Sequence, residues 1–358
     1  MLSAMVRLTR VQQQARTRAA VLVAATAEFA ERGYADARID RIAERAELTR
    51  GAVYSNFPGK RALYLAVLLD SVRRAATPSR PAPADVVDAA EAFARVWLER
   101  LPLAGDTAAG GKLRSQSLAG VFDDQPGRAV MAELARLEAL LLALALESGA
   151  PRPAQRRMRL AELILTLLHG AGQVAQSMPG FGDPFDVARA CGHLTSMELA
   201  DVWDPPYLPY VSPPELGRTP WRPPPELTDE ITARPAGFDG DGIVAVLGAR
   251  RLSAAEEAVR AARPGDLVTI AVVTNDPAET GALVRLRITD MVACLRRVFT
   301  PAVPPAVRVV LDERAALAAA VGVDPAEDTE AAVRVRDGDV IARAHGRGAA
   351  YAVAGAIR

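Results

Sequence analysis

The chain has 358 residues, of which 50% are hydrophobic, and 43 basic side chains balance 43 acidic ones to a formal net charge of zero. That length predicts two or three domains, each with enough apolar residues to bury a core, and the composition excludes a disordered chain. Residues 1–80 hold 14 Arg or Lys against 7 Asp or Glu, a net of +7, which leaves −7 for the remainder. A basic end on a neutral chain is typical of a nucleic-acid-binding module joined to something else, although a solvated basic face is the alternative.

The cysteines and the apolar runs exclude several further classes. Cys191 and Cys294 have neither a CxxC neighbour nor a histidine at ligand spacing, so we expect no metal site and no dithiol chemistry. Residues 1–18 contain four arginines and no apolar stretch of signal-peptide length. The longest apolar runs, such as 139–146, are too short to span a bilayer. We therefore expect a soluble, cytoplasmic protein that uses no membrane, metal or cofactor.

The N-terminal part is predicted to be helical after a polar arm at 1–14. A first helix is expected over 17–32. Ile42, Ala43 and Ala46 then give a short helix one apolar stripe. Thr49 can cap a second short helix, and Val53 and Phe57 give that helix an apolar face of its own. Two short helices joined by about four residues predict a helix-turn-helix.

The exposed side of the second short helix suits a DNA groove. With Val53 turned inward, Gly51, Tyr54 and Ser55 lie on the outward side. Small residues there let a helix enter a major groove closely, and Tyr54 can reach a phosphate. A further helix is expected from 60 to about 75, followed by a proline-containing turn at 77–84.

These residues together resemble the TetR-type DNA-binding domain. The matching positions are Ile42-Ala43, the run Leu48–Tyr54, Phe57, Lys60 and Leu63, preceded by Leu22, Ala25, Phe29, Gly33 and Tyr34 in the first helix. Two positions depart from the family pattern. Glu47 stands where the family usually has a turn glycine, and Arg38 stands where it usually has a threonine that begins the second helix.

The resemblance implies a dimer that places two recognition helices in successive major grooves of a pseudo-palindromic operator. It implies that phosphates are held by Thr49, Tyr54, Asn56 and Lys60, with Arg38 at one further phosphate position. It implies that base edges are faced by Arg50, Gly51, Ala52 and Ser55. Among the residues that face bases, Arg50 alone has a side chain long enough to bind guanine through two hydrogen bonds.

Residues 85–200 are predicted to form a helical bundle, with helices over 85–101, 128–148, 155–178 and 185–199 and a loop over 105–111. Family resemblance makes the last two helices the dimer interface and the bundle interior a pocket for a small-molecule effector. Inward-facing aromatic or polar residues suggest the lining of that pocket: Phe93, Trp97, Phe122 and His169. A bundle with a filled core and no ligand is the alternative.

Residues 201–237 contain ten prolines, with Trp203, Tyr207, Tyr210 and Trp221 between them. Proline at this density forbids a helix and favours extended backbone. Exposed aromatic side chains would be costly on a free spacer. We therefore expect a semi-rigid linker that lies against a flanking domain, with a recognition site for another protein as the alternative.

The rest of the chain alternates predicted strands and helices. Strands are expected over 243–247, 267–273, 307–311, 331–336 and 340–344, and helices over 253–262, 277–299, 313–321 and 349–357. The order βαβαβαββα and the closing stretch 336–357 resemble the thioredoxin fold.

The thiol chemistry of that fold is missing. A thioredoxin carries CxxC where the second strand meets the second helix, and here residues 274–280 hold no cysteine. Glu330 replaces the cis-proline, and Cys294 lies deep inside the long helix. Without a thiolate there is no nucleophile for disulfide exchange. We expect a scaffold, sensor or oligomerisation module.

The sequence thus predicts a multidomain protein with an all-α N-terminal part and a C-terminal α/β thioredoxin-like domain. The expected boundaries are 15–76 for the helix-turn-helix domain, 85–200 for the ligand-binding and dimerisation bundle, 201–237 for the Pro-rich linker and 238–358 for the α/β domain. The favoured function is a non-enzymatic, homodimeric transcriptional repressor that binds operator DNA and is released by a small-molecule effector. The alternative is a redox or interaction protein that acts through the C-terminal domain.

Overall fold

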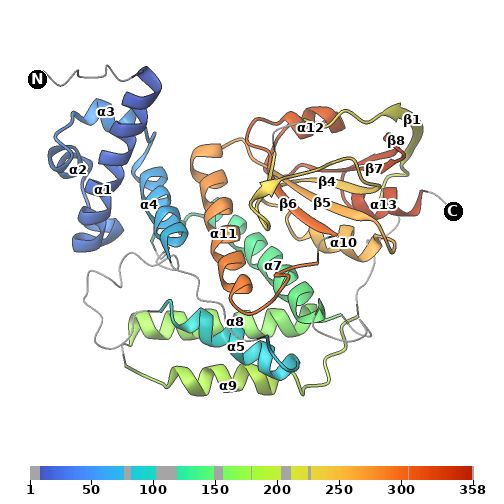
Figure 1. The fold of residues 1–358 in the computed structure, drawn as a ribbon, viewed down its shortest axis with the longest axis horizontal. Helices are drawn as coiled ribbons and strands as arrows, with labels where there is room; N and C mark the ends of the chain where they lie inside the picture. The colour runs from blue at the N-terminus through green and yellow to red at the C-terminus, as the bar shows by residue number, and fades with distance from the viewer. Residues whose placement is uncertain are drawn as a thin grey trace, which may run out of the picture.

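The structure, a computed structural model, describes residues 9–75, 82–101, 118, 120–148, 156–178, 180–202, 211–224, 227–304 and 306–356. Three regions follow one another in space (Figure 1): a group of N-terminal helices at one end, a helical bundle beside it, and a mixed sheet with its helices at the other end. Among the described residues, no helix combines the length and apolarity needed to cross a bilayer.

The N-terminal region consists of α1 (Arg10–Asp36), α2 (Ile39–Arg45), α3 (Arg50–Tyr54) and α4 (Lys60–Arg74). The first helix begins earlier than the sequence predicted, because Thr9 and Gln12 form a reciprocal capping box. Residues 10–14 are therefore helical and do not form a polar arm, while 1–8 lie outside the described residues. The kink at Gly33, where φ is 73°, ends the regular part of α1.

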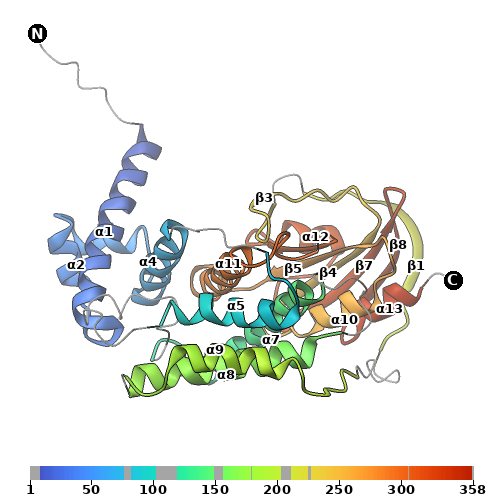
Figure 2. The same ribbon diagram turned by 60° about the horizontal axis from the view of Figure 1, so that its bottom comes forward.

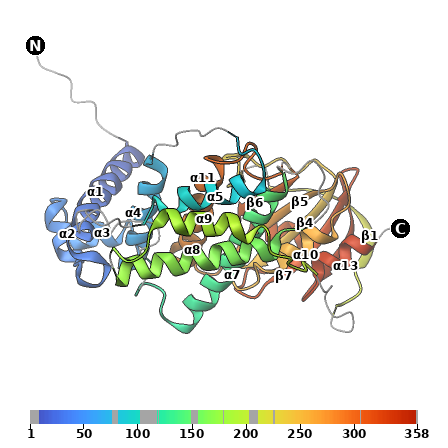
Figure 3. The same ribbon diagram turned by 90° about the horizontal axis from the view of Figure 1, so that it is seen from below.

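The bundle consists of α5 (Val86–Leu98), α7 (Gln125–Ser148), α8 (Met158–Ser177) and α9 (Pro184–Leu194). These helices match the predicted ones within a few residues, except that α9 ends at Leu194 and not near 199. The predicted loop at 105–111 and most of the predicted turn at 77–84 lie outside the described residues. α8 and α9 lie side by side along the face of the molecule seen in Figure 3.

The sheet has the strand order β1-β8-β7-β4-β5-β6-β2-β3. Its strands are β1 (Glu215–Pro220), β2 (Thr228–Asp229), β3 (Arg234–Pro235), β4 (Gly242–Gly248), β5 (Leu267–Val273), β6 (Val307–Leu311), β7 (Glu330–Arg336) and β8 (Asp339–His345). β4, β5 and β6 are parallel, and β7 and β8 run antiparallel beside β4. The buried runs in β5 and β6 have the predicted bounds.

The Pro-rich stretch supplies strands at both edges of this sheet. β1 pairs with β8, and β2 pairs with β6. Edge strands tolerate proline because one row of their backbone N–H groups needs no partner in the sheet. The boundary expected at 237 therefore cuts through the sheet, and residues 215–235 belong structurally to the C-terminal region.

Helices cover both faces of the sheet (Figure 2). One face packs against α10 (Ala254–Ala261), α11 (Ala282–Arg296) and α13 (Ala349–Gly355), and a short π-helix, η2 (Pro277–Gly281), precedes α11. The opposite face packs against α12 (Ala316–Val321) and partly buried Trp221. The long helix predicted from 277 is thus a π-turn followed by an α-helix.

The helix α11 joins the three regions. It packs against α4 of the N-terminal region and against α5 and α7 of the bundle, and its other side faces the sheet. Leu283, Leu286, Ile288 and Leu295 point in different directions around the helix, and each is 0% exposed. One apolar core therefore continues from the N-terminal helices through the bundle to the sheet.

Charged groups fix the contact between α11 and the bundle. Arg287 of α11 donates to Glu138 of α7 at 2.6 Å, and both side chains are almost fully buried. Arg100, which follows α5, lies 3.0 Å from Asp290 of α11. Burial raises the pKa of Glu138, and Arg287 opposes that rise. Buried pairs of this kind tolerate little sliding, because a displaced charge loses its partner inside an apolar core.

Replacing Arg287 with Leu is expected to lower the free energy of unfolding by roughly 3 to 5 kcal/mol, because Glu138 loses its buried partner. The double variant Glu138→Leu/Arg287→Leu removes both charges and is expected to recover most of that loss. Urea denaturation of the full chain measures both values. Equal losses in the single and double variants would show that packing, and not the ion pair, determines the effect.

Candidate nucleic-acid interface

Backbone hydrogen bonds close the turn between α2 and α3. The N–H of Leu48 donates to the carbonyl of Ala43 at 2.9 Å, and the N–H of Glu47 donates to the carbonyl of Glu44 at 3.0 Å. These two bonds form the helix ending that requires a left-handed residue directly after the helix. Glu47 adopts that conformation, with φ of 55°. The turn thus forms although a glutamate occupies the position of the usual glycine.

A buried carboxylate on α1 positions α2. Glu28 is 0% exposed, accepts the backbone N–H of Arg38 at 3.3 Å and lies 3.4 Å from Nε of Arg45. It therefore holds both ends of α2 against α1. Arg38 occupies the N-cap position of α2 without a capping bond from its side chain, which is exposed.

The short helix α3 presents the side that the sequence predicted. The hydroxyl of Thr49 accepts the N–H of Ala52 at 3.2 Å and caps the helix. Val53 is 1% exposed and Phe57 is 3% exposed, so both dock α3 onto the other N-terminal helices. On the opposite side, the exposed residues are Thr49, Arg50, Gly51, Tyr54 and Ser55, and Ala52 and Asn56 are half-buried.

Two of the three long cations predicted to contact DNA, Arg50 and Lys60, have partners within the protein. Nε of Arg50 lies 2.7 Å from a carboxylate oxygen of Asp40 on α2, and both side chains are exposed. Nζ of Lys60 donates to the carbonyl of Ala35 at 2.9 Å, and burial lowers the pKa of this amine. Each contact restrains the side chain, although the guanidinium and ammonium groups have further N–H donors.

Two residues near α3 were not identified from the sequence. Arg18 of α1 lies over the ring of Phe57 at 4.2 Å from its centre and donates to the carbonyl of Asn56 at 3.1 Å. Asp40 restrains Arg50, as described above. Neither contact has a local sequence signal, because each joins residues from different helices.

Three of the four suggested pocket residues come together in the bundle. The rings of Phe93 and Trp97 lie 5.9 Å apart, and those of Trp97 and His169 lie 5.3 Å apart. Phe93 is 0% exposed and Trp97 is 1% exposed, so these rings fill the space between the helices. Phe122 lies elsewhere, beneath Arg61 of α4 and beside a hollow of about 410 Å³ between α7 and the sheet.

Two titratable groups of the core, His169 and Cys294, have pKa values shifted towards their neutral forms. Burial, with the charges of Arg287 and Arg100, lowers the pKa of His169 to about 4. Burial raises the pKa of Cys294 to about 12, and Arg100 lies against its sulfur. A thiol with that pKa is not a nucleophile near neutral pH. Within the described residues, no group of three or more His, Cys, Asp or Glu side chains is placed to hold a metal ion.

Replacing Glu47 with Gly is expected to raise the free energy of unfolding by about 1 kcal/mol, because glycine adopts the left-handed conformation without strain. Glu47→Ala is the matched control, because it removes the carboxylate but keeps the strained Cβ. It is expected to change the free energy of unfolding little. Thermal melting of the three proteins tests this. Destabilisation by Glu47→Gly would show that the carboxylate itself supports the turn.

Acid is expected to destabilise the protein through His169. Its pKa in the folded chain lies below the ordinary 6.5, so the unfolded chain binds a proton first as the pH falls. The contribution of neutral His169 to the free energy of unfolding is complete above pH 6.5. It decreases between about pH 6.5 and 4, by up to about 3 kcal/mol. Urea denaturation at pH 7 and pH 4.5 should show a smaller loss for His169→Phe than for the original chain. His193→Phe, a change at an exposed histidine, is the control, and equal losses in all three proteins would contradict the assignment.

Comparison with known proteins places the N-terminal helices in a family. Residues 21–67 match the family described as "Bacterial regulatory proteins, tetR family". No curated protein matches the chain. Among solved structures, a TetR transcriptional regulator from Rhodococcus sp. RHA1 is similar at 22% identity, covering 51% of this chain and 97% of that one with a TM-score of 0.32.

Two further structures give comparable values. A TetR transcriptional regulator from Chloroflexus aurantiacus J-10-FL has 27% identity over 51% of this chain and 93% of that chain, with a TM-score of 0.34. The transcriptional regulator FadR from Bacillus subtilis, in complex with stearoyl-CoA, is 15% identical. The match covers 50% of this chain and 97% of that chain, with a TM-score of 0.32. The family match and the geometry of α2, the turn and α3 agree: the N-terminal part of this chain is a helix-turn-helix domain of the TetR family.

Proposed function

We propose that the protein is a homodimeric, ligand-responsive repressor that binds a pseudo-palindromic operator through α3. The observation that carries this proposal is the orientation of α3. Val53 is buried against the other helices, while Arg50, Gly51, Tyr54 and Ser55 remain exposed on one side. A rigidly docked helix with small and donor-bearing residues on its free side matches the shape and hydrogen-bonding pattern of a major groove.

The proposed division of roles follows these positions. Thr49, Tyr54 and Lys60 contact phosphates, together with Asn56 and Arg38. Arg50 reads a base edge, with the small residues Gly51, Ala52 and Ser55 beside it. Asn56 donates to the carbonyl of Ala52 at 2.9 Å, so its own contact to DNA requires that this bond be shared or exchanged.

The proposed dimer uses α8 and α9. Large apolar side chains stand exposed at and beside these helices: Phe181 is 71% exposed, Phe185 is 70% exposed and Met178 is 50% exposed. Exposed apolar groups of this size are typical of a surface that a second protein chain covers. A two-fold axis through this surface would pair the same residues of two copies.

We further propose that the C-terminal α/β region is related to the thioredoxin fold and acts as a sensor or scaffold. The order of strands and helices supports this relation, while β1, β2 and β3 extend the sheet at its edges. A redox function is disfavoured, because both cysteines are buried and their pKa values are raised to about 12. An effector that enters the bundle would have to displace the closely packed rings of Phe93, Trp97 and His169.

DNA selection from a random duplex library, followed by a salt series, tests the function. Arg50→Ala is expected to lose roughly 1 to 3 kcal/mol of binding free energy on the selected duplex and less on a scrambled one. Lys60→Ala should weaken both duplexes equally and reduce the salt slope by about one unit per contact.

The matched control is Arg74→Ala, a change at an exposed arginine at the far end of α4 that pairs with Asp70. Failure of the library to yield any preferred duplex would refute sequence-specific binding. Equal losses for Arg50→Ala on both duplexes would make Arg50 a backbone contact, and specificity would then rest on DNA shape.

A further inference from the structure

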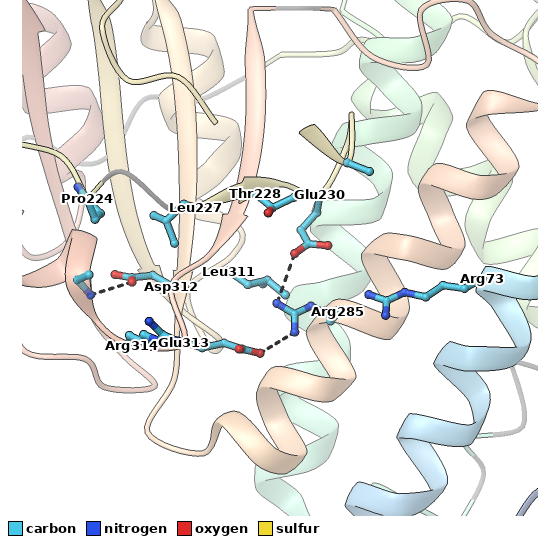
Figure 4. A pocket seen from close by; sticks show the side chains of 12 residues that line it. Arg73, Pro224, Leu227, Thr228, Glu230, Arg285, Leu311, Asp312, Glu313 and Arg314 are labelled. Atoms are coloured by element: carbon cyan, nitrogen blue, oxygen red, sulfur yellow. Dashed lines mark hydrogen bonds and ion pairs between the residues drawn. The ribbon is translucent and has the colours of Figure 1, made fainter. Parts of the chain in front are cut away.

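A hollow of about 550 Å³ lies where the last turn of α4 meets the carboxyl end of β6 (Figure 4). Its walls come from α4, the first turn of α11, the β2–β3 hairpin and the segment that follows β6. The hollow is outside both surfaces described so far, the exposed side of α3 and the interior of the bundle. Its volume lies within the range of sites for small organic ligands, which is roughly 300 to 1,000 Å³.

The sheet topology explains why space remains here. The chain leaves β5 towards η2 and α11 on the face that meets the bundle. It leaves β6 towards α12 on the opposite face. Where the connections after neighbouring parallel strands diverge to opposite faces, they leave a crevice at the carboxyl ends of the strands, and ligands of α/β proteins bind there.

Some of the charged side chains that line the hollow have direct partners and others do not. Arg285 pairs with both Glu313 at 2.7 Å and Glu230 at 3.4 Å. Asp312 accepts three backbone N–H groups at the start of α12, each at 2.8 Å. Within the described residues, Arg73 and Arg314 are exposed and make no hydrogen bond or ion pair. Neither guanidinium group therefore contacts a carboxylate directly, although the charge of Arg73 acts on Glu230 from a distance.

The positions of these arginines suit a ligand that joins two regions. Arg73 extends from α4 towards Arg285 and Glu230, while Arg314 lies on the far side of the hollow (Figure 4). Leu227 and Leu311 supply apolar wall between them. A guanidinium group binds a carboxylate or phosphate through two parallel hydrogen bonds.

We infer that this hollow binds a small organic anion, with an apolar body on Leu227 and Leu311 and a carboxylate or phosphate head held by Arg73. The ligand joins α4 to the C-terminal sheet. The helix α4 follows α3 directly, and Arg61 in its first turn forms ion pairs with Asp124 and Glu279. A ligand at the last turn of α4 therefore acts on the same helix that supports the proposed DNA-binding surface. This consequence for DNA binding rests on the proposed function, whereas the binding of the anion does not.

The first experiment uses the full chain and no DNA. The fluorescent anion 8-anilinonaphthalene-1-sulfonate is titrated into the protein, with uncharged N-phenyl-1-naphthylamine as its counterpart. Saturable binding of the anion, at least tenfold tighter than that of the uncharged compound, is expected. Arg73→Ala should weaken binding of the anion tenfold or more, since it removes a charged hydrogen-bond donor, and Arg314→Ala, on the far side of the hollow, should weaken it less. Arg74→Ala, a change at the neighbouring arginine that pairs with Asp70, should leave its binding unchanged.

Displacement distinguishes the two kinds of head group. Octanoate, octyl phosphate and octanol compete with the bound fluorophore, and whichever anion displaces it at lower concentration identifies the preferred head. Octanol, which has no charge, should displace the fluorophore only at a concentration at least tenfold higher than that of the preferred anion. Equal binding of the fluorophore to the original chain and to Arg73→Ala would overturn the inference, as would equal affinity for the charged and uncharged compounds.

The second experiment measures DNA affinity with and without the bound anion. A change of fivefold or more that Arg73→Ala abolishes would support coupling through α4. No change in DNA affinity would refute the coupling and leave the binding site intact. Absence of DNA binding under all conditions would refute the proposed function, while the fluorescence titration would still decide whether the hollow binds anions.

Discussion

The burial of α11 is the constraint on which the arrangement of this molecule depends. A helix with apolar residues in every direction is stable in water only when other elements surround it. The sheet covers one side, and α4, α5 and α7 cover the rest. The pair of Arg287 and Glu138 then fixes the orientation of the helix, since charges removed from water must meet their partners. The C-terminal region is therefore an integral part of the molecule's core.

In this arrangement, α4 bears at each end an arginine that faces another region of the molecule. Its first turn bears Arg61, which contacts both the bundle and η2, and its last turn bears Arg73 beside the C-terminal sheet. A ligand can alter DNA binding only if it binds two arrangements of the molecule with different affinities. In the proposed function, a ligand reaches the hollow beside α4 without displacing packed side chains, which a ligand in the bundle interior would have to do. The rings of Phe93 and Trp97 already fill the bundle interior, whereas the hollow beside α4 is open.

The parts of this structure that a local sequence pattern determines were predictable. Continuous apolar runs defined β5 and β6, and the burial of Val53 and Phe57 followed from helical spacing. The edge strands β1 and β3 were missed because each contains a proline, which argues against a strand unless the strand lies at an edge, and sequence does not reveal edges. The partners of Arg50 and Lys60 were missed for a related reason: these contacts depend on how separate helices pack. The surroundings of α11 were likewise beyond local patterns, because an apolar helix does not specify what covers it.

The partner of Arg50 bears directly on the base contact proposed for this side chain. An exposed ion pair such as Arg50–Asp40 is worth about 0.2 to 1 kcal/mol, whereas a two-bond contact from arginine to guanine is worth about 1 to 3 kcal/mol. On the correct base, the exchange of partners is favourable. On an incorrect base, Arg50 gains little by leaving Asp40 and keeps this partner. The loss of the ion pair therefore falls on the correct complex, and Asp40 lowers the net gain from the proposed contact of Arg50 with guanine.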